Sequence, residues 1–148
     1  MQIAKQAFVD TNVLVYALYS DSPFHTASRA LLDRVQTDES LTFCLSSQIL
    51  SEFYAIVTNP KRVSEVQSSE KALGAVEALL ALQRVTLLPI TGETVVAWMK
   101  LARHHAPQGA NIFDLQIAAT MLVHGVSEIY TFNRRHFEKF DGIKVLAP

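Results

Sequence analysis

With 148 residues, of which 49% are hydrophobic, the chain has the size of one ordinary domain and can fill a core, which excludes an intrinsically disordered protein. Its formal net charge of −1 excludes a general basic field, so any affinity for nucleic acid must come from a local patch or a bound metal ion. We expect residues 1–148 to form a single domain, because no repeat, low-complexity tract or linker divides them.

The single cysteine, Cys44, cannot form an internal disulfide, which favours a reducing cytoplasm as the location. The apolar run near the N-terminus is short and ends at an acid, unlike a signal peptide. No apolar stretch approaches the length that spans a bilayer. We therefore expect a soluble, cytoplasmic protein without contact to a membrane.

Short β-like runs alternate along the chain with longer helical segments. This alternation predicts the α/β class, with a mostly parallel sheet and helices on both of its faces. The predicted strands are 6–10, 42–46, 85–89, 127–132 and 143–146. The predicted helices are 12–19, 24–36, 48–58, 68–83, 93–105 and 112–124.

The strands differ in the burial that they predict. Residues 42–45 and 85–88 are continuous apolar runs, as expected for strands that are buried on both faces. Residues 143–146 alternate more, which suits an edge strand. Within the helices, apolar residues at helical spacing indicate the core rather than contacts with a cofactor.

Residues at several boundaries predict where helices begin or end. Ser46 or Ser47 can cap the helix over 48–58. Asn111 is expected to cap the helix over 112–124, and Gly125 to end it. The loop that precedes this last helix (residues 104–110) leads toward an acid within it.

Asp10 is the most informative residue, because an apolar strand ends on it and a helix follows at once. Ligands of open α/β sheets bind at the carboxyl edge of the sheet, where this carboxylate would lie. The alternative is that Asp10 only caps the helix or makes a turn with its own backbone.

Glu52 and Asp114 are two further acids within or at the start of apolar helices. Glu52 falls at the edge of an apolar stripe, and it could instead be a boundary glutamate that extends to water. Asp114 follows Asn111 by three residues, and it could instead take part in a reciprocal cap at a helix N-terminus. Isolated acids on hydrophobic elements are costly unless something pairs with them, and a shared divalent cation would explain all three acids.

Asn133 lies just past the fourth predicted strand, at the same edge of the sheet as Asp10. Its amide oxygen can bind a cation or hold a water molecule, although a role in turn geometry is an equal alternative. Oxygen ligands with few His or Cys residues nearby favour Mg²⁺ or Mn²⁺, and no Cys/His set has the spacing of a zinc site.

Four segments taken together resemble the PIN domain, and more narrowly the VapC-type toxins of bacterial toxin–antitoxin pairs. Their order and spacing are those of the family, and they extend over nearly the whole chain. The segments are Val9-Asp10-Thr11-Asn12, Ser51-Glu52-Phe53, Phe113-Asp114-Leu115-Gln116-Ile117-Ala118-Ala119 and Thr131-Phe132-Asn133-Arg134-Arg135-His136-Phe137.

The resemblance implies a three-layer α/β/α sandwich and a metal-dependent endoribonuclease that uses Mg²⁺ or Mn²⁺. The acids of the family correspond to Asp10, Glu52 and Asp114, and its fourth acidic position is Asn133 here. We expect Asp10 and Asp114 to bind the metal directly and Glu52 to hold a metal-bound water, with a possible role as its base. Supporting hydroxyls are expected from Thr11, Ser47 and Thr131.

The RNA and protein partners are also expectations. Arg134 and Arg135 are candidate contacts for RNA phosphates, and Lys61, Arg62 and Lys139 are further candidates. The limited number of basic residues suggests selection of structured RNA by shape and by its unpaired loops. The family resemblance implies a small antitoxin protein as partner and a homodimer.

Two other functions are compatible with parts of the sequence. Asn133 in an acidic position leaves open a catalytically silent PIN-like module that binds RNA or protein. A phosphoryl-transfer domain with Asp10 as nucleophile is less favoured, because such domains place a second acid two residues later, where this chain has Asn12.

Overall fold

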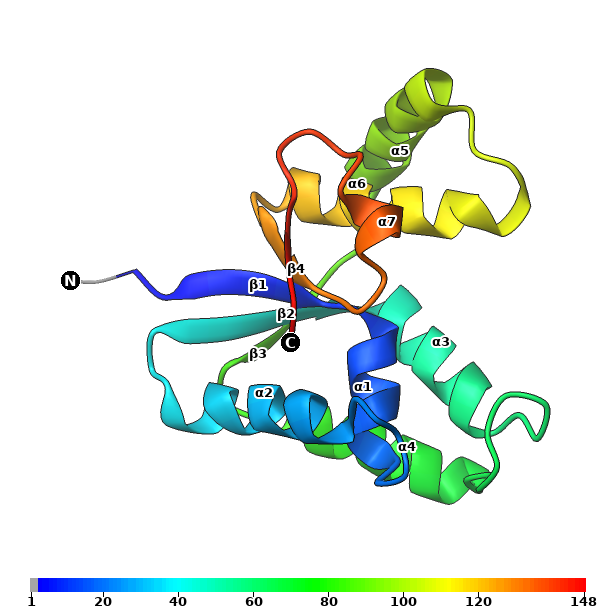
Figure 1. Ribbon diagram of the computed structural model, residues 1–148. Helices are drawn as coiled ribbons and strands as arrows, with labels where there is room; N and C mark the ends of the chain where they lie inside the picture. The colour runs from blue at the N-terminus through cyan, green and yellow to red at the C-terminus, as the bar shows by residue number, and fades with distance from the viewer. Residues whose placement is uncertain (1–2) are drawn as a thin grey trace.

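The computed structural model describes residues 3–148, in which five strands form one sheet (Figure 1). The strands are β1 (Lys5–Val9), β2 (Leu41–Ser46), β3 (Val85–Leu88), β4 (Glu128–Tyr130) and β5 (Lys144–Leu146). Their order across the sheet is β3-β2-β1-β4-β5, and every neighbouring pair is parallel. The carboxyl ends of all five strands therefore meet at one edge, which is where parallel sheets bind ligands.

Helices cover both faces of this sheet, as the sequence predicts. Helices α1 to α4 lie on one side in Figure 1, and α5 to α7 lie on the other, which gives three layers. The bounds are α1 (Thr11–Leu18), α2 (His25–Thr37), α3 (Ser47–Val57), α4 (Ser69–Leu80), α5 (Gly92–His105), α6 (Ile112–Val123) and α7 (Arg134–Phe137). A 3₁₀ turn (Gly109–Asn111) precedes α6.

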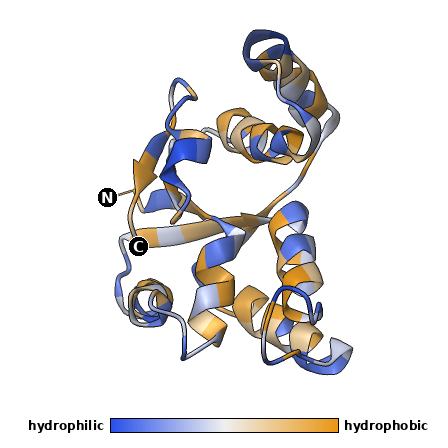
Figure 2. Ribbon diagram, turned by 45° about the vertical axis from the view of Figure 1, so that its right-hand side comes forward, coloured by the Kyte–Doolittle hydropathy of each residue, from blue (hydrophilic) through white to orange (hydrophobic). Residues whose placement is uncertain are grey.

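The core lies between the sheet and the helices on both sides. Buried apolar side chains from β1, β2 and β4 meet those of α1, α3 and α6 there, and Figure 2 shows the hydrophobic colouring along these strands and helices. Phe8, Phe43, Phe53, Leu115 and Ile129 are among the largest fully buried side chains. Burial of this apolar surface fixes the sheet under the loops that carry the polar residues.

The two outer strands give opposite results for the predicted burial. The prediction that β5 is an edge strand is confirmed. The prediction that residues 85–88 are buried on both faces is wrong, because β3 is the other edge strand and Leu87 is 47% exposed. The apolar composition of this strand does not reveal its place in the strand order.

The helix boundaries agree with the sequence apart from their capping. Ser46 occupies the N-cap position of α3 and Asn111 that of α6, but neither side chain makes a capping hydrogen bond. Gly125 follows the end of α6 with a φ of 69°, as expected for a glycine that ends a helix. The short helix α7 is absent from the predicted elements. Across residues 3–148, the helices are too short or too polar to cross a membrane.

Candidate active site

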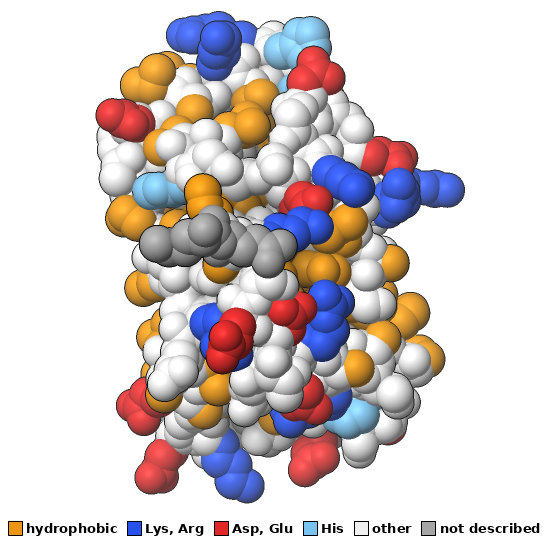
Figure 3. Space-filling model, turned by 90° about the vertical axis from the view of Figure 1, so that its left-hand side faces the viewer, with side chains coloured by type: hydrophobic (Ala, Val, Ile, Leu, Met, Phe, Trp, Pro, Cys, Tyr) orange, Lys and Arg blue, Asp and Glu red, His pale blue; other side chains and the backbone are white. Residues whose placement is uncertain are grey.

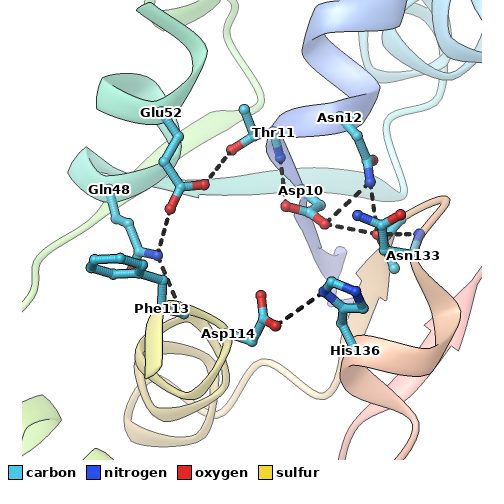
Figure 4. Close-up of polar contacts among 10 residues, drawn as sticks. Asp10, Thr11, Asn12, Gln48, Glu52, Phe113, Asp114, Asn133 and His136 are labelled. Atoms are coloured by element: carbon cyan, nitrogen blue, oxygen red, sulfur yellow. Dashed lines mark hydrogen bonds and ion pairs between the residues drawn. The ribbon is translucent and has the colours of Figure 1, made fainter. Parts of the chain in front are cut away.

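A cavity of about 350 Å³ lies at the carboxyl edge of the sheet. It brings together four of the predicted site residues, Asp10, Glu52, Asp114 and Asn133, from four separate parts of the chain (Figure 4). The complete lining is Asp10, Thr11, Asn12, Val15, Tyr16, Glu52, Ile56, Arg62, Asp114, Ile117, Asn133 and His136.

Asp10 lies at the base of the cavity, between the end of β1 and the first residue of α1. Its side chain is held by donors on both oxygens: the backbone N–H of Thr11 donates to Oδ1 over 2.7 Å, and the Thr131 hydroxyl donates to Oδ2 over 2.7 Å. The Asn12 amide donates more weakly to Oδ2 over 3.4 Å. Asp10 therefore caps α1 and also lines the cavity, so the two interpretations of this residue are compatible.

The environment of Asp10 disfavours its charged form. The residue is only 7% exposed, and this burial raises the pKa of its carboxyl. The hydrogen bonds from Thr131 and Thr11 oppose the rise, whereas the negative charges of Glu52 and Asp114 add to it. Among residues 3–148, no lysine or arginine forms an ion pair with Asp10 or Glu52.

Glu52 reaches into the cavity from α3 rather than extending to water. Thr11 donates its hydroxyl to Oε2 over 3.1 Å, and the Gln48 amide donates to Oε1 over 2.9 Å. Gln48 also donates to the backbone oxygen of Phe113 over 3.0 Å, and Gln116 donates to Oε1 of Gln48 over 2.7 Å. Gln48 therefore connects α3 with the beginning of α6 (Figure 4), and Gln116 adds a second hydrogen bond between these helices.

Asp114 lies in the first turn of α6, on the opposite side of the cavity from Asp10 (Figure 4). Nδ1 of His136 lies 3.0 Å from Oδ2 of Asp114. Burial raises the pKa of the Asp114 carboxyl, and the nearby positive charges of His136 and Lys139 oppose this rise. The carboxylate contacts α7 rather than Asn111, so the reciprocal cap is not formed.

The supporting residues are placed differently from one another. Thr131 is central, because its oxygen donates to Asp10 and accepts from the Asn12 amide and from the backbone N–H of Asn133. Ser47 lies outside the Asp10 cavity and lines a neighbouring hollow with Gln48.

The candidate RNA-binding residues also differ in whether they line the cavity. Arg62 lines the cavity, but Arg134 and Arg135 do not. Arg134 is exposed at the start of α7 and pairs with Glu138 at 3.3 Å. On the side of the N-terminus, Figure 3 shows acidic and basic side chains close together rather than one extended patch of either sign.

Two residues of the site, Gln48 and His136, were not predicted to act in it. His136 belongs to the segment after the fourth strand, and its contact with Asp114 depends on how α7 meets α6. Gln48 precedes Glu52 by one helical turn, a spacing at which side chains on a helix contact each other. This spacing was the only signal in the sequence for its role.

The chemistry of the cavity fits a hard divalent cation. The candidate ligands are oxygen atoms. Burial is the main cause of the raised pKa of Asp10, the negative charges of Glu52 and Asp114 add to it, and a bound cation would favour the charged carboxylate. Within residues 3–148, no three Asp, Glu, His or Cys side chains stand together as a ready ligand set. Asp10 and Asp114 are the carboxylates that would hold such an ion, with water completing its coordination, as is usual for Mg²⁺.

Comparisons with known proteins show which family the chain resembles. The family model described as PIN domain matches residues 7–143. Ribonuclease VapC48 of Mycobacterium tuberculosis is 27% identical over 139 residues, which cover 94% of each chain. Ribonuclease VapC24 of the same organism is 30% identical over 145 residues, which cover 95% of this chain and 94% of the relative.

A solved structure shows the same fold. The structure of VapBC2 from Rickettsia felis, bound to a DNA fragment from its promoter, matches with a TM-score of 0.68 and 17% identity. The match covers 96% of this chain and 98% of that chain. The sequence and the fold agree, and the chain belongs to the PIN-domain family, within the group of VapC ribonucleases.

Proposed function

We propose that the protein is a metal-dependent endoribonuclease, the toxin of a type II toxin–antitoxin pair, which hydrolyses phosphodiester bonds in structured RNA. The observation that carries this proposal is the meeting of Asp10, Glu52 and Asp114 in one cavity at the carboxyl edge of the sheet. The relationship to VapC ribonucleases supports the same activity.

The two aspartates are the proposed metal ligands. A bound Mg²⁺ or Mn²⁺ would supply the neutralisation of phosphoryl charge and the lowering of the pKa of water that phosphodiester hydrolysis needs. Asp10 presents a carboxylate that Thr131 and Thr11 hold in one orientation. Asp114 presents its carboxylate from the opposite side of the cavity, where His136 holds one of its oxygens.

Glu52 is the proposed base, and Asn133 is the proposed polar contact that completes the site. Both Glu52 oxygens accept hydrogen bonds, from Thr11 and Gln48, which orients the carboxylate toward the cavity. A carboxylate held in this way can accept a proton from an attacking water molecule. Asn133 supplies an uncharged amide oxygen, which adds no repulsion to the three acids.

Basic residues around the cavity are proposed to hold the RNA backbone. Arg62 lies in the lining, and Arg134 and Arg135 begin the helix that follows Asn133. A guanidinium can bind a phosphate through two parallel hydrogen bonds. Because these residues are few, the affinity for RNA should fall only moderately as the salt concentration rises.

The test compares wild type with Asp114→Asn on total RNA, with Mn²⁺, with Mg²⁺ and with EDTA. We expect wild type to cleave only with a divalent cation, and the variant to lose the activity by about 10³-fold, because several kcal/mol of charge stabilisation are lost. Glu39→Gln is the matched control. Glu39 is an exposed acid in the turn before β2, at the end of the sheet opposite to the cavity.

Two results would contradict the proposal. Equal cleavage by a folded Asp114→Asn protein would remove Asp114 from the site. RNA binding by wild type without cleavage under any of these conditions would favour the catalytically silent module. Circular dichroism of each variant shows whether it is folded.

The protein partner is proposed to be an antitoxin that covers an apolar groove between α1, α2 and α4. This groove has a volume of about 260 Å³, and its lining includes Leu14, Leu32 and Leu79. A groove of this kind suits the apolar face of a partner helix. We also propose a homodimer, a cytoplasmic location and a single domain over residues 1–148. Sedimentation of the purified chain tests the dimer.

A further inference from the structure

Three aromatic rings form a cluster at the side of the candidate active site. Tyr16 belongs to α1, Phe24 to the loop between α1 and α2, and Phe132 to the segment after β4. The ring centroids are 5.1 Å apart for Tyr16 and Phe24, 5.3 Å for Tyr16 and Phe132, and 4.6 Å for Phe24 and Phe132. We call these three residues the aromatic platform.

The aromatic platform borders the cavity and is exposed at Phe24, whereas Tyr16 and Phe132 are partly buried. Tyr16 lines the cavity itself, and Phe132 directly precedes Asn133, which also lines it. Phe24 is 41% exposed, although it is a large apolar side chain. Phe24 is therefore the ring of the platform that a ligand can reach from solvent.

The loop that carries Phe24 is held by several hydrogen bonds. The Ser22 hydroxyl accepts from the backbone N–H of Phe24 over 3.1 Å, and the backbone oxygen of Ser22 accepts from the N–H of His25 over 3.1 Å. Nδ1 of His25 lies 2.9 Å from the backbone oxygen of Tyr16. The rings are therefore positioned before any ligand binds, which lowers the entropic cost of binding.

One side chain connects the aromatic platform to the acidic cavity. The amide oxygen of Asn12 accepts a hydrogen bond from the backbone N–H of Phe132 over 3.4 Å. The amide nitrogen of Asn12 donates to Oδ2 of Asp10, also over 3.4 Å. The position of the platform is thus fixed relative to the carboxylate that is proposed to bind metal. Because Tyr16 belongs to both the platform and the cavity lining, a ligand on the rings would lie beside the cavity.

We propose that the aromatic platform stacks one unpaired base of the RNA substrate beside the phosphodiester that is cleaved. This inference rests on the proposed function. Aromatic side chains bind unpaired bases by stacking, and such binding needs no positive charge. The chain has a net charge of −1 and a site of acids, so an uncharged contact suits the approach of RNA.

A segment of a protein partner is the other class of ligand that could cover these rings. The apolar groove between α1, α2 and α4 offers such a segment a separate surface, and its lining shares no residue with the aromatic platform. The platform instead touches the lining of the acidic cavity. We therefore assign it to the nucleic acid, and binding of a protein is an outcome of the test.

The experiment uses a short RNA hairpin that contains a cleavage site mapped with wild type and Mn²⁺. An abasic residue replaces each unpaired nucleotide of the loop in turn. We expect one abasic position to lower kcat/KM by about tenfold, mainly through KM, since stacking on one ring contributes on that order. Phe24→Leu should lower kcat/KM on intact RNA by a similar factor, and should add no further loss on that abasic hairpin.

A second readout is independent of cleavage. Hairpins that carry 2-aminopurine at each unpaired loop position in turn are titrated with protein in EDTA, and stacking quenches the fluorescence of the base. We expect wild type and Phe24→Trp to quench it, and Phe24→Leu and Phe24→Ala to quench it much less. Thermal melting compares the folding of the variants, and Leu keeps the apolar volume of the site.

The outcomes separate this inference from the proposed function. Quenching without cleavage would retain the platform and contradict the nuclease. The proposal for the platform would be wrong if Phe24→Leu cleaved and quenched like wild type. It would also be wrong if the losses in kcat/KM caused by Phe24→Leu and by the abasic residue multiplied when the two were combined. In either case a segment of a protein partner becomes the class of ligand that the rings fit.

Discussion

The two aspartates of the site are held in different ways, although both belong to the same cavity. Asp10 follows the central strand of the sheet, is buried, and accepts hydrogen bonds from its neighbour Thr11 and from Thr131 after the adjacent strand. Asp114 is only partly buried and contacts the half-exposed His136 from a four-residue helix. One acid is positioned by the sheet, and the other by contacts between helices.

This difference indicates that the two sides of the cavity depend on different parts of the fold. The sheet fixes Asp10 through residues next to it in the sequence and through the next strand. The distance from Asp10 to Asp114 depends on how α6 meets α3 and α7, and the Gln48 bridge to the Phe113 oxygen is part of that contact. Changes on the two sides should therefore have different effects on stability and on activity.

The largest expected effect comes from Asp10→Asn. We expect cleavage to fall by about 10³-fold, since a charged ligand is lost. In EDTA the same variant should melt no lower than wild type, because burial and the neighbouring acids disfavour the charge that it removes. Calorimetry checks the melting temperature, and a clearly lower value would show that the carboxylate is needed for folding.

The next effect concerns the bridge between the two sides. Gln48→Leu removes the donor to Glu52 and the link to the backbone of Phe113. We expect cleavage and Mn²⁺ affinity to fall by about 10–100-fold, as is usual when a residue that orients a ligand is lost. Gln83→Leu, at an exposed position after α4, is the control, and equal behaviour of both variants would contradict the role of the bridge.

Three variants test the difference in stability. Thr131→Val leaves the buried Asp10 carboxylate without its hydroxyl donor and should lower the free energy of unfolding by about 1–3 kcal/mol. Thr131→Ser keeps the donor and should retain most of the stability. His136→Ala removes a half-exposed contact and should cost less than about 1 kcal/mol. Denaturant unfolding measures all three, and equal losses for Val and Ala would remove the distinction between the two sides.

The smallest effect is a dependence on pH. Because burial raises the pKa of Asp10, the folded protein binds this proton more readily than the unfolded chain, whose carboxyl has a pKa near 3.8. The contribution of Asp10 to stability is therefore present below 3.8 and is lost as the pH rises through the raised pKa. In EDTA, wild type should lose stability relative to Asp10→Asn as the pH is raised through this window, and a constant difference in melting temperature would contradict the shift.

The sequence predicted the parts of the fold and site that depend on local patterns. The alternation of short apolar runs with helical stripes indicated the sheet and its helical layers. Asp10 was recognised because a strand that ends on an acid places it at the binding edge. Glu52 and Asp114 were recognised as acids on apolar helices, and the structure places both in the same cavity.

The features that were missed depend on contacts between distant segments. The exposed edge of β3 follows from the strand order, which its residues do not encode. The contact between His136 and Asp114 requires the placement of α7 against α6, and the contact between Gln48 and Gln116 requires that of α3 against α6. Ser47 has the right residue type beside a predicted helix start, but it faces a different hollow.

The central place of β1 in the sheet has a further consequence. Amides in a strand with a partner on each side exchange their hydrogens slowly, because they open only when most of the domain unfolds. β1 has such partners in β2 and β4, and it ends at Asp10. Local opening of the short helix α7 would remove the contact of His136 with Asp114 without disturbing Asp10, because Asp10 is held by the centre of the sheet.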